Sequence, residues 1–205
     1  MTISNFKPIS RIYRNKLPKR ILDEINAVCI DAVNKSGEAL QWVPEELRDR
    51  EICLAAVSTY GLAISWVPDE FKYDREICLA AISNTGEVLK YVPYELRDRE
   101  ICLAAVSKYG LSLFYVPYAL RRDREICLAA VHSRGPALNY VPEDLRDKEI
   151  CLIAINNDSP LLHVPDEIRD RDIYLAAVNK GIPLESVPFD LRDKEICLAA
   201  VNNDG

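Results

Sequence analysis

A motif of nine residues recurs through the chain at intervals of 23 to 25 residues, and this repetition constrains the fold more than any other feature. One copy runs from Asp98 to Val106, and the others begin at Asp49, Asp74, Asp123, Asp147, Asp170 and Asp193. An eighth, degenerate copy runs from Ala27 to Val33. Repeats of 20–50 residues are typical of solenoids, in which each unit buries its apolar face against its neighbours.

Each copy carries the signals of a short helix and a turn. Asp49 is a favourable N-cap, and the apolar run from Ile52 to Val57 follows it. A glycine such as Gly61 is expected to end the helix. A Val-Pro pair, such as Val67-Pro68, then kinks the chain before a second, shorter helix. We therefore predict an all-α solenoid of about eight helical-hairpin repeats, each of about 24 residues.

The repeats follow a segment of different composition. We expect a basic N-terminal arm, residues 1–20, and an array, residues 21–205, with repeats near 21–42, 43–66, 67–91, 92–115, 116–140, 141–163, 164–186 and 187–205. The first repeat is expected to be a cap with a solvated outer face, because Asp31 stands where later repeats have alanine or isoleucine. The last apolar run lacks such a change. The chain is therefore expected to be a fragment of a longer array, and either a monomer or associated end to end through residues 193–205.

The composition excludes several classes of protein. No apolar run approaches the roughly 18 residues of a membrane helix, and residues 1–7 do not resemble a signal peptide. Six of the seven cysteines occupy one position of the repeat, which indicates packing and not a disulfide framework. This usage predicts a reducing, cytoplasmic location.

Charge is distributed unevenly along the chain. Residues 1–20 hold six basic and no acidic residues, whereas residues 21–205 hold 20 basic and 32 acidic residues. The acidic array should repel nucleic acids and anionic membranes. The arm leaves nucleic-acid or membrane binding as an alternative function, although a structural role is also expected, in which Ile12, Tyr13 and Leu17 pack on the first repeat.

No motif indicates catalysis or a cofactor. A zinc site needs closely spaced ligands, and here each cysteine lies one repeat from the next. His163 stands in a column of aromatic residues and His132 in a column of serine and asparagine. No motif places a cysteine or serine to form a nucleophile–base pair with either histidine. We predict no enzyme activity, no metal and no cofactor.

Several repeat positions are assigned structural roles. The leucines of the apolar runs are expected to be well-packed core residues, so that Leu103→Ala costs about 2–5 kcal/mol; they are Leu54, Leu79, Leu103 and Leu128. An aromatic residue that closes each turn is also structural, namely Trp42, Trp66, Tyr91, Tyr115 and Tyr140. A basic residue before the N-cap, such as Arg48, is expected to bridge to acidic groups of adjacent repeats.

Two sets of variable positions are candidates for partner binding. One set lies between the helix and the turn and contains Tyr60, Tyr109, His132 and Arg134. The other set follows the proline and contains Tyr94, Tyr118 and Phe189. Aromatic side chains at exposed positions are favoured anchors of protein interfaces. Ordinary surface variation is the alternative explanation.

The repeats resemble those of domain of unknown function 4116. The resemblance rests on the combination of Leu-Arg-Asp-x-Glu with Leu-Ala-Ala-Val, as in residues 91–115 and 116–140, and covers roughly residues 21–205. Similar repeats occur in large proteins of intracellular bacteria, including secreted effectors, and of some protists. The resemblance implies no catalytic residue, and it adds a host cytosol as an alternative location.

These observations predict a non-catalytic protein–protein interaction scaffold that forms part of a secreted bacterial effector. Stacked repeats display long rows of side chains, and such surfaces usually bind proteins or peptides. The sequence does not identify the partner.

Overall fold

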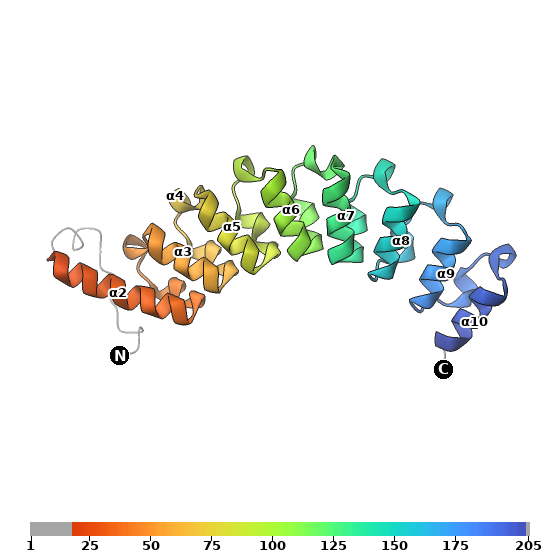
Figure 1. Ribbon diagram of the computed structural model, residues 1–205, viewed down its shortest axis with the longest axis horizontal. Coiled ribbons are helices and arrows are strands. Elements are labelled where there is room, and N and C mark those ends of the chain that lie inside the picture. The colour runs from red at the N-terminus through yellow and green to blue at the C-terminus, as the bar shows by residue number, and fades with distance from the viewer. Residues whose placement is uncertain (1–17, 204–205) are drawn as a thin grey trace. The chain divides into compact units, whose positions relative to one another are not determined.

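The computed structural model describes residues 18–203, and this range contains helices and no strand, which confirms the predicted all-α solenoid. Each repeat is a short α-helix followed by two brief helical segments, most of them 3₁₀ helices (η), on either side of the Val-Pro pair (Figure 1). The chain divides into two compact units, unit 1 (residues 1–108) and unit 2 (residues 109–205).

Unit 1 contains five α-helices within its described residues and five 3₁₀ helices. They are α2 (Lys19–Lys35), η2 (Gly37–Trp42), η3 (Glu45–Leu47), α3 (Arg50–Thr59), η4 (Gly61–Trp66), α4 (Asp69–Lys72), α5 (Arg75–Asn84), η5 (Gly86–Tyr91), η6 (Tyr94–Leu96) and α6 (Arg99–Lys108). Helices α2, α3, α5 and α6 stack in chain order. Because α2 begins at Lys19, the last two residues of the expected arm are helical. The rest of the arm, including Ile12, Tyr13 and Leu17, lies outside the described residues.

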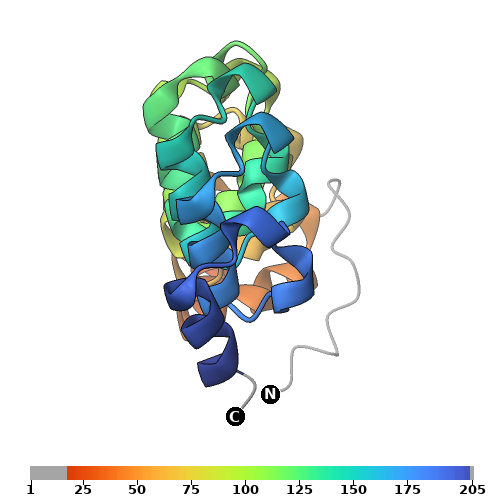
Figure 2. The ribbon, with the colours of Figure 1, turned by 90° about the vertical axis from the view of Figure 1, so that its right-hand side faces the viewer.

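Unit 2 repeats the same arrangement. Its elements are η7 (Gly110–Tyr115), η8 (Leu120–Arg122), α7 (Arg124–Ser133), η9 (Gly135–Tyr140), η10 (Glu143–Leu145), α8 (Lys148–Asn156), η11 (Leu161–His163), η12 (Asp166–Ile168), α9 (Arg171–Asn179), η13 (Leu184–Ser186), η14 (Phe189–Leu191) and α10 (Lys194–Asn203). Helix α10 packs on α9, and its outer side lies at the front of Figure 2. Val201 on α10 is 68% exposed, whereas the equivalent Val131 and Val178 are fully buried.

The predicted N-caps are confirmed. Asp49 accepts a hydrogen bond from the backbone N–H of Ile52 at 3.0 Å, and Asp98 accepts one from Ile101 at 2.9 Å. These bonds satisfy donors that the first helical turn leaves without partners. The helices α3 and α6 therefore each begin directly after an aspartate cap.

Four positions form the core in each of the helices α3 and α5 to α9. In α6, Ile101, Cys102, Ala105 and Val106 are 0% exposed, whereas Leu103 is only partly buried. The prediction of a well-packed core leucine is therefore wrong for the leucine position, where all four expected residues are partly exposed; they are Leu54, Leu79, Leu103 and Leu128. A helix turns by about 100° per residue. The four buried positions therefore share one side of the helix, and the leucine points away from that side.

The aromatic position is also more exposed than expected. Trp42 is 63% exposed and Tyr91 is 37% exposed, so neither ring lies in the core. The equivalent Trp66, Tyr115 and Tyr140 are partly buried. The aromatic residue is the last of its 3₁₀ helix and points outward, whereas the residue two positions earlier is buried, as Leu40 and Ile64 are.

The glycine that recurs in the repeats has a different role at Gly61 from the one predicted. Gly61 does not end α3 in a left-handed conformation but begins η4, where it is buried. A Cβ atom at this position would lie 2.5 Å from the carbonyl oxygen of Ala81 in the next repeat helix. Glycine is thus required for the close approach of two backbones.

The cysteine position has a packing role. The Cys78 thiol donates to the carbonyl oxygen of Lys72 at 3.1 Å, and the Cys127 thiol donates to that of Arg121 at 3.0 Å. Burial raises the pKa of the Cys53 thiol to about 12, so this thiol stays protonated. All cysteines are free.

The basic residue before the N-cap was predicted to bridge to acidic groups of adjacent repeats. At Arg48 and Arg146 it binds backbone carbonyls instead. Arg48 donates through Nε to the carbonyl of Val43 at 2.8 Å and through Nη1 to that of Trp66 in the next repeat at 2.7 Å. Arg146 makes the equivalent bonds to Val141 and His163. The guanidinium satisfies carbonyls that short 3₁₀ helices leave without donors.

A row of ion pairs between repeats is made by the basic residue that directly follows the N-cap, such as Arg50 after Asp49. Arg75 on α5 binds Asp98 at 3.0 Å and Glu100 at 2.6 Å, and the pair holds the pKa of Arg75 above its ordinary value. Equivalent pairs begin at Arg50, Arg124, Lys148 and Arg171. We call this row the ladder.

Candidate functional site

The residues that follow each Val-Pro pair form one edge of each unit, which we call the proline edge. In unit 1 it consists of residues 45–46, 69–70 and 94–95, and in unit 2 of residues 118–119, 143–144, 166–167 and 189–190. The valine before the proline is buried and anchors the segment, as Val67 shows at 2% exposure. The first residue after the proline points into solvent.

Three predicted partner-binding residues occupy this first position. Tyr94 is 64%, Tyr118 65% and Phe189 86% exposed. The guanidinium carbon of Arg97 lies 5.9 Å from the centre of the Tyr94 ring, and that of Arg192 lies 5.8 Å from the Phe189 ring. These cation–π contacts hold the two rings against their own 3₁₀ segments.

The other four candidates lie at the opposite ends of the α-helices. Tyr60 directly follows α3 and stacks on Trp66 with a centroid distance of 6.3 Å. Arg134 lies 5.6 Å from the ring centre of Tyr109, and His132 is exposed near the end of α7. A ten-residue helix is about 15 Å long. The seven candidates are therefore divided between two edges and do not form one site.

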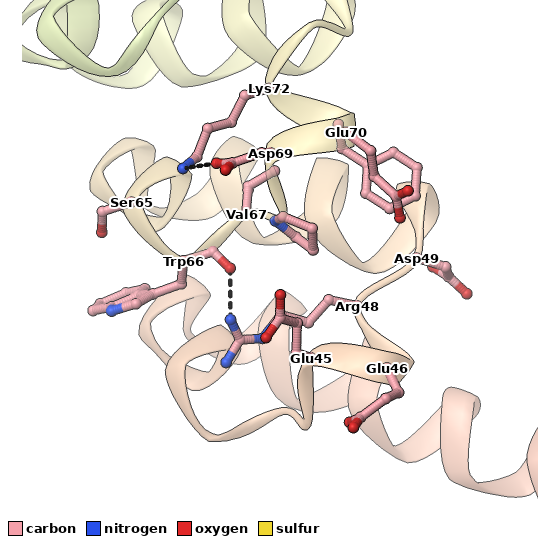
Figure 3. A pocket seen from close by; sticks show the side chains of 12 residues that line it. Glu45, Glu46, Arg48, Asp49, Ser65, Trp66, Val67, Asp69, Glu70 and Lys72 are labelled. Atoms are coloured by element: carbon pink, nitrogen blue, oxygen red, sulfur yellow. Dashed lines mark hydrogen bonds and ion pairs between the residues drawn. The ribbon is translucent and has the colours of Figure 1, made fainter. Parts of the chain in front are cut away.

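A groove on the proline edge of unit 1 lies between η3 and α4 and has a volume of about 890 Å³ (Figure 3). Its lining includes five acidic and two basic residues, namely Glu45, Glu46, Asp49, Asp69, Glu70, Arg48 and Lys72. Arg48 is directed at the Trp66 carbonyl, and Lys72 binds Asp69 at 2.8 Å. The hydrogen bond from Lys72 holds the pKa of Asp69 below its ordinary value.

Unit 2 contains a similar groove of about 420 Å³ between η10 and η12. Its acidic residues are Glu143, Asp166 and Glu167. His163 also lines it, and burial lowers the pKa of this imidazole, so the ring is neutral at pH 7.

The proline edge of unit 2 also contains an ion pair between consecutive repeats. Arg122 binds both oxygens of Asp144, with Nη1–Oδ1 and Nη2–Oδ2 distances of 3.2 and 2.5 Å. Hydrogen bonding to Arg122 lowers the pKa of Asp144. Arg122 is an additional residue of its repeat, placed between Arg121 and the N-cap Asp123.

Sequence reasoning did not single out several exposed apolar side chains. Tyr73 is 60%, Phe114 52% and Leu162 75% exposed. Tyr73 is the other additional residue in the array, so the lengthened repeats were the available signal for it and for Arg122. Nothing in the repeat pattern marks Phe114 or Leu162.

Within residues 18–203, no group of three or more histidine, cysteine or acidic side chains is arranged to hold a metal ion. No helix in that range is long and apolar enough to cross a membrane. The described side chains present grooves and exposed rings.

Comparison with known proteins places the repeats in one family. The family model described as "Domain of unknown function (DUF4116)" matches six overlapping segments, residues 28–72, 49–97, 74–121, 98–146, 123–169 and 147–192. Neither the curated proteins nor the solved structures that were compared contain a match. Because the matched segments together extend from residue 28 to residue 192, the chain belongs to the DUF4116 family.

Proposed function

We propose that this chain is a non-catalytic scaffold that binds another protein along its proline edge. One observation supports this function most directly. The residue after each Val-Pro pair is exposed and varies in identity, as Asp69 and Tyr94 do. The valines of these pairs, such as Val67 and Val92, are constant and buried. A constant frame with variable exposed positions suits recognition.

The three exposed aromatic rings are the proposed anchors. An aromatic side chain supplies a large contact area at low cost in conformational entropy, and such residues are frequent hot spots. The arginines that lie over Tyr94 and Phe189 limit their movement before binding.

The test is capture of partners by the triple variant Tyr94→Ala/Tyr118→Ala/Phe189→Ala from bacterial and host-cell lysates. We expect loss of the partners that the unaltered chain captures, with an unchanged thermal unfolding midpoint. Phe114→Ala is the matched control, because Phe114 is exposed but lies outside the proline edge. Equal capture by the triple variant would assign binding to another surface.

A second function, binding of nucleic acid or an anionic membrane, rests on the six basic side chains of residues 1–20. It predicts an affinity that falls steeply with salt and is lost when the arm, residues 1–20, is deleted. Binding that is insensitive to salt would dismiss it.

The proposed location is a reducing compartment, and the free, buried thiols support it. Membership of a secreted effector remains an expectation from the family resemblance. Fractionation of infected host cells with an antibody to the chain would test both.

A further inference from the structure

The grooves of the proline edge contain more acidic than basic side chains, and the basic ones are already engaged. In the unit 1 groove, Arg48 donates to two carbonyls and Lys72 to Asp69. Glu45 and Glu70 are exposed on opposite walls, on η3 and α4. Glu45 and Glu70 therefore present carboxylates that neither Arg48 nor Lys72 engages.

The structure contains one example of what such a position binds. Asp144 is the second residue after its proline, and it accepts two hydrogen bonds from the guanidinium of Arg122 in the preceding repeat. Two parallel N–H to oxygen bonds are the preferred geometry between arginine and a carboxylate. The equivalent residues of the two grooves are Glu70 and Glu167.

Both grooves follow a repeat that lacks the additional residue. Arg48 is followed directly by the N-cap Asp49, and Arg146 directly by Asp147, so neither repeat supplies a counterpart of Arg122. Glu70 and Glu167 are exposed. The chain thus supplies its own arginine at Asp144 because the additional residue of the preceding repeat is Arg122, and the repeats before Glu70 and Glu167 have no additional residue.

We propose that each groove binds an arginine side chain of a partner protein, with Glu70 or Glu167 accepting the guanidinium as Asp144 accepts Arg122. This inference rests on the proposed function and names the chemistry of the partner, an arginine-containing peptide segment. Arginine is favoured over lysine because its planar fork matches a carboxylate, whereas an ammonium is a compact, strongly hydrated charge.

The first test uses the full chain and fluorescein-labelled hexa-arginine, hexalysine and hexacitrulline, followed by fluorescence anisotropy. Citrulline keeps the shape of arginine without its charge. We expect Glu70→Gln/Glu167→Gln to weaken hexa-arginine binding by roughly fivefold, the upper range for an exposed arginine–carboxylate pair. The matched control is Glu38→Gln/Glu185→Gln, which removes one exposed carboxylate from each unit outside the grooves.

The second test opens the position that Arg122 occupies. Arg122→Ala should add a binding site for hexa-arginine at saturation, because it frees Asp144. Arg134→Ala removes the same charge from an exposed arginine elsewhere in unit 2 and should add none.

Four outcomes would overturn the proposal. Equal weakening by the groove and control variants would mean diffuse attraction to an acidic chain. Equal affinity for hexalysine would remove the preference for the guanidinium. Binding that appears only after deletion of residues 1–17 would make the basic arm the occupant. Loss of partner capture by the aromatic variant, with hexa-arginine binding absent, would reject this inference and leave the proposed function intact.

Discussion

Neighbouring repeats meet through two regions that differ in chemistry. The first, the seam, consists of fully buried side chains such as Ile77 and Ala81, of a glycine in contact with backbone, and of an arginine bound to carbonyls. The second is the exposed ladder, in which Arg75 binds Asp98 and Glu100. Both recur in each unit, but burial strengthens contacts only in the seam, because water screens exposed charges.

The difference teaches which repeated residues carry stability. Repetition in the sequence is equally strong for the seam and the ladder, so recurrence alone does not rank them. Buried apolar area and backbone contact determine which of the two regions contributes more to stability. The following predictions test this ranking, from the largest expected effect to the smallest.

Replacement of the isoleucine of α6 should cost the most. Ile101→Ala removes a fully buried side chain and should lower the free energy of unfolding by about 2–5 kcal/mol. Leu103→Ala, two residues away, should cost clearly less, because Leu103 is partly exposed. Urea unfolding followed by circular dichroism measures both; equal losses would contradict the burial of this helix.

A side chain on the seam glycine should also be costly. Gly61→Ala places a Cβ 2.5 Å from the Ala81 carbonyl, and overpacking of this kind costs about 1–3 kcal/mol. Gly181→Asn is the control, since Gly181 has open space around it and a φ of +88°, which asparagine tolerates. Thermal unfolding should show the larger decrease in midpoint for Gly61→Ala, because Gly181→Asn introduces backbone strain at a positive φ but no clash.

Loss of the arginine that binds the carbonyls should have an intermediate effect. Arg48→Met keeps most of the apolar stem but removes the bonds to Val43 and Trp66, and should cost roughly 1.5–3 kcal/mol. Amide hydrogen exchange should rise in residues 41–48 and 61–68. Unchanged exchange there would mean that the carbonyls find other donors.

The ladder should contribute least, and its contribution should depend on pH. The hydrogen bond from Arg50 lowers the pKa of Asp74 below its ordinary value of 3.8, so this contribution is present above about pH 4 and is lost as pH falls further. The thermal unfolding midpoint should therefore decrease when the pH is lowered below 4. The double variant Arg50→Ala/Arg171→Ala should reduce the pH dependence of the midpoint and change the midpoint at pH 7 only slightly. A large change at pH 7 would mean that the ladder stabilises the fold as much as the seam does.

The repeat period, the helices and their N-caps could be predicted because they are local. An aspartate before an apolar run is a favoured N-cap. A repeat period of about 24 residues is compatible with few architectures. The pairing of the two basic positions could not be predicted. Arg48 and Arg50 lie on either side of the same N-cap, Asp49, and only the stacked neighbour shows that Arg48 meets carbonyls and Arg50 meets Asp74.

The candidate site was predicted in part. The variable positions after the proline are visible in the sequence, and their exposure follows from the buried valine beside them. The grooves and the pairing of Arg122 with Asp144 were not foreseen, since they join residues 22 positions apart across two repeats.

The sequence by itself determined the class of fold, the length of the repeat and the places where helices begin, because these depend on local hydrogen bonding and on the period of apolar residues. Only the tertiary structure decided which side of each helix is buried, why a glycine is needed and which cation meets which acceptor. Those properties depend on the distance between one repeat and the next, and that distance is set by packing and not by the order of residues within a repeat.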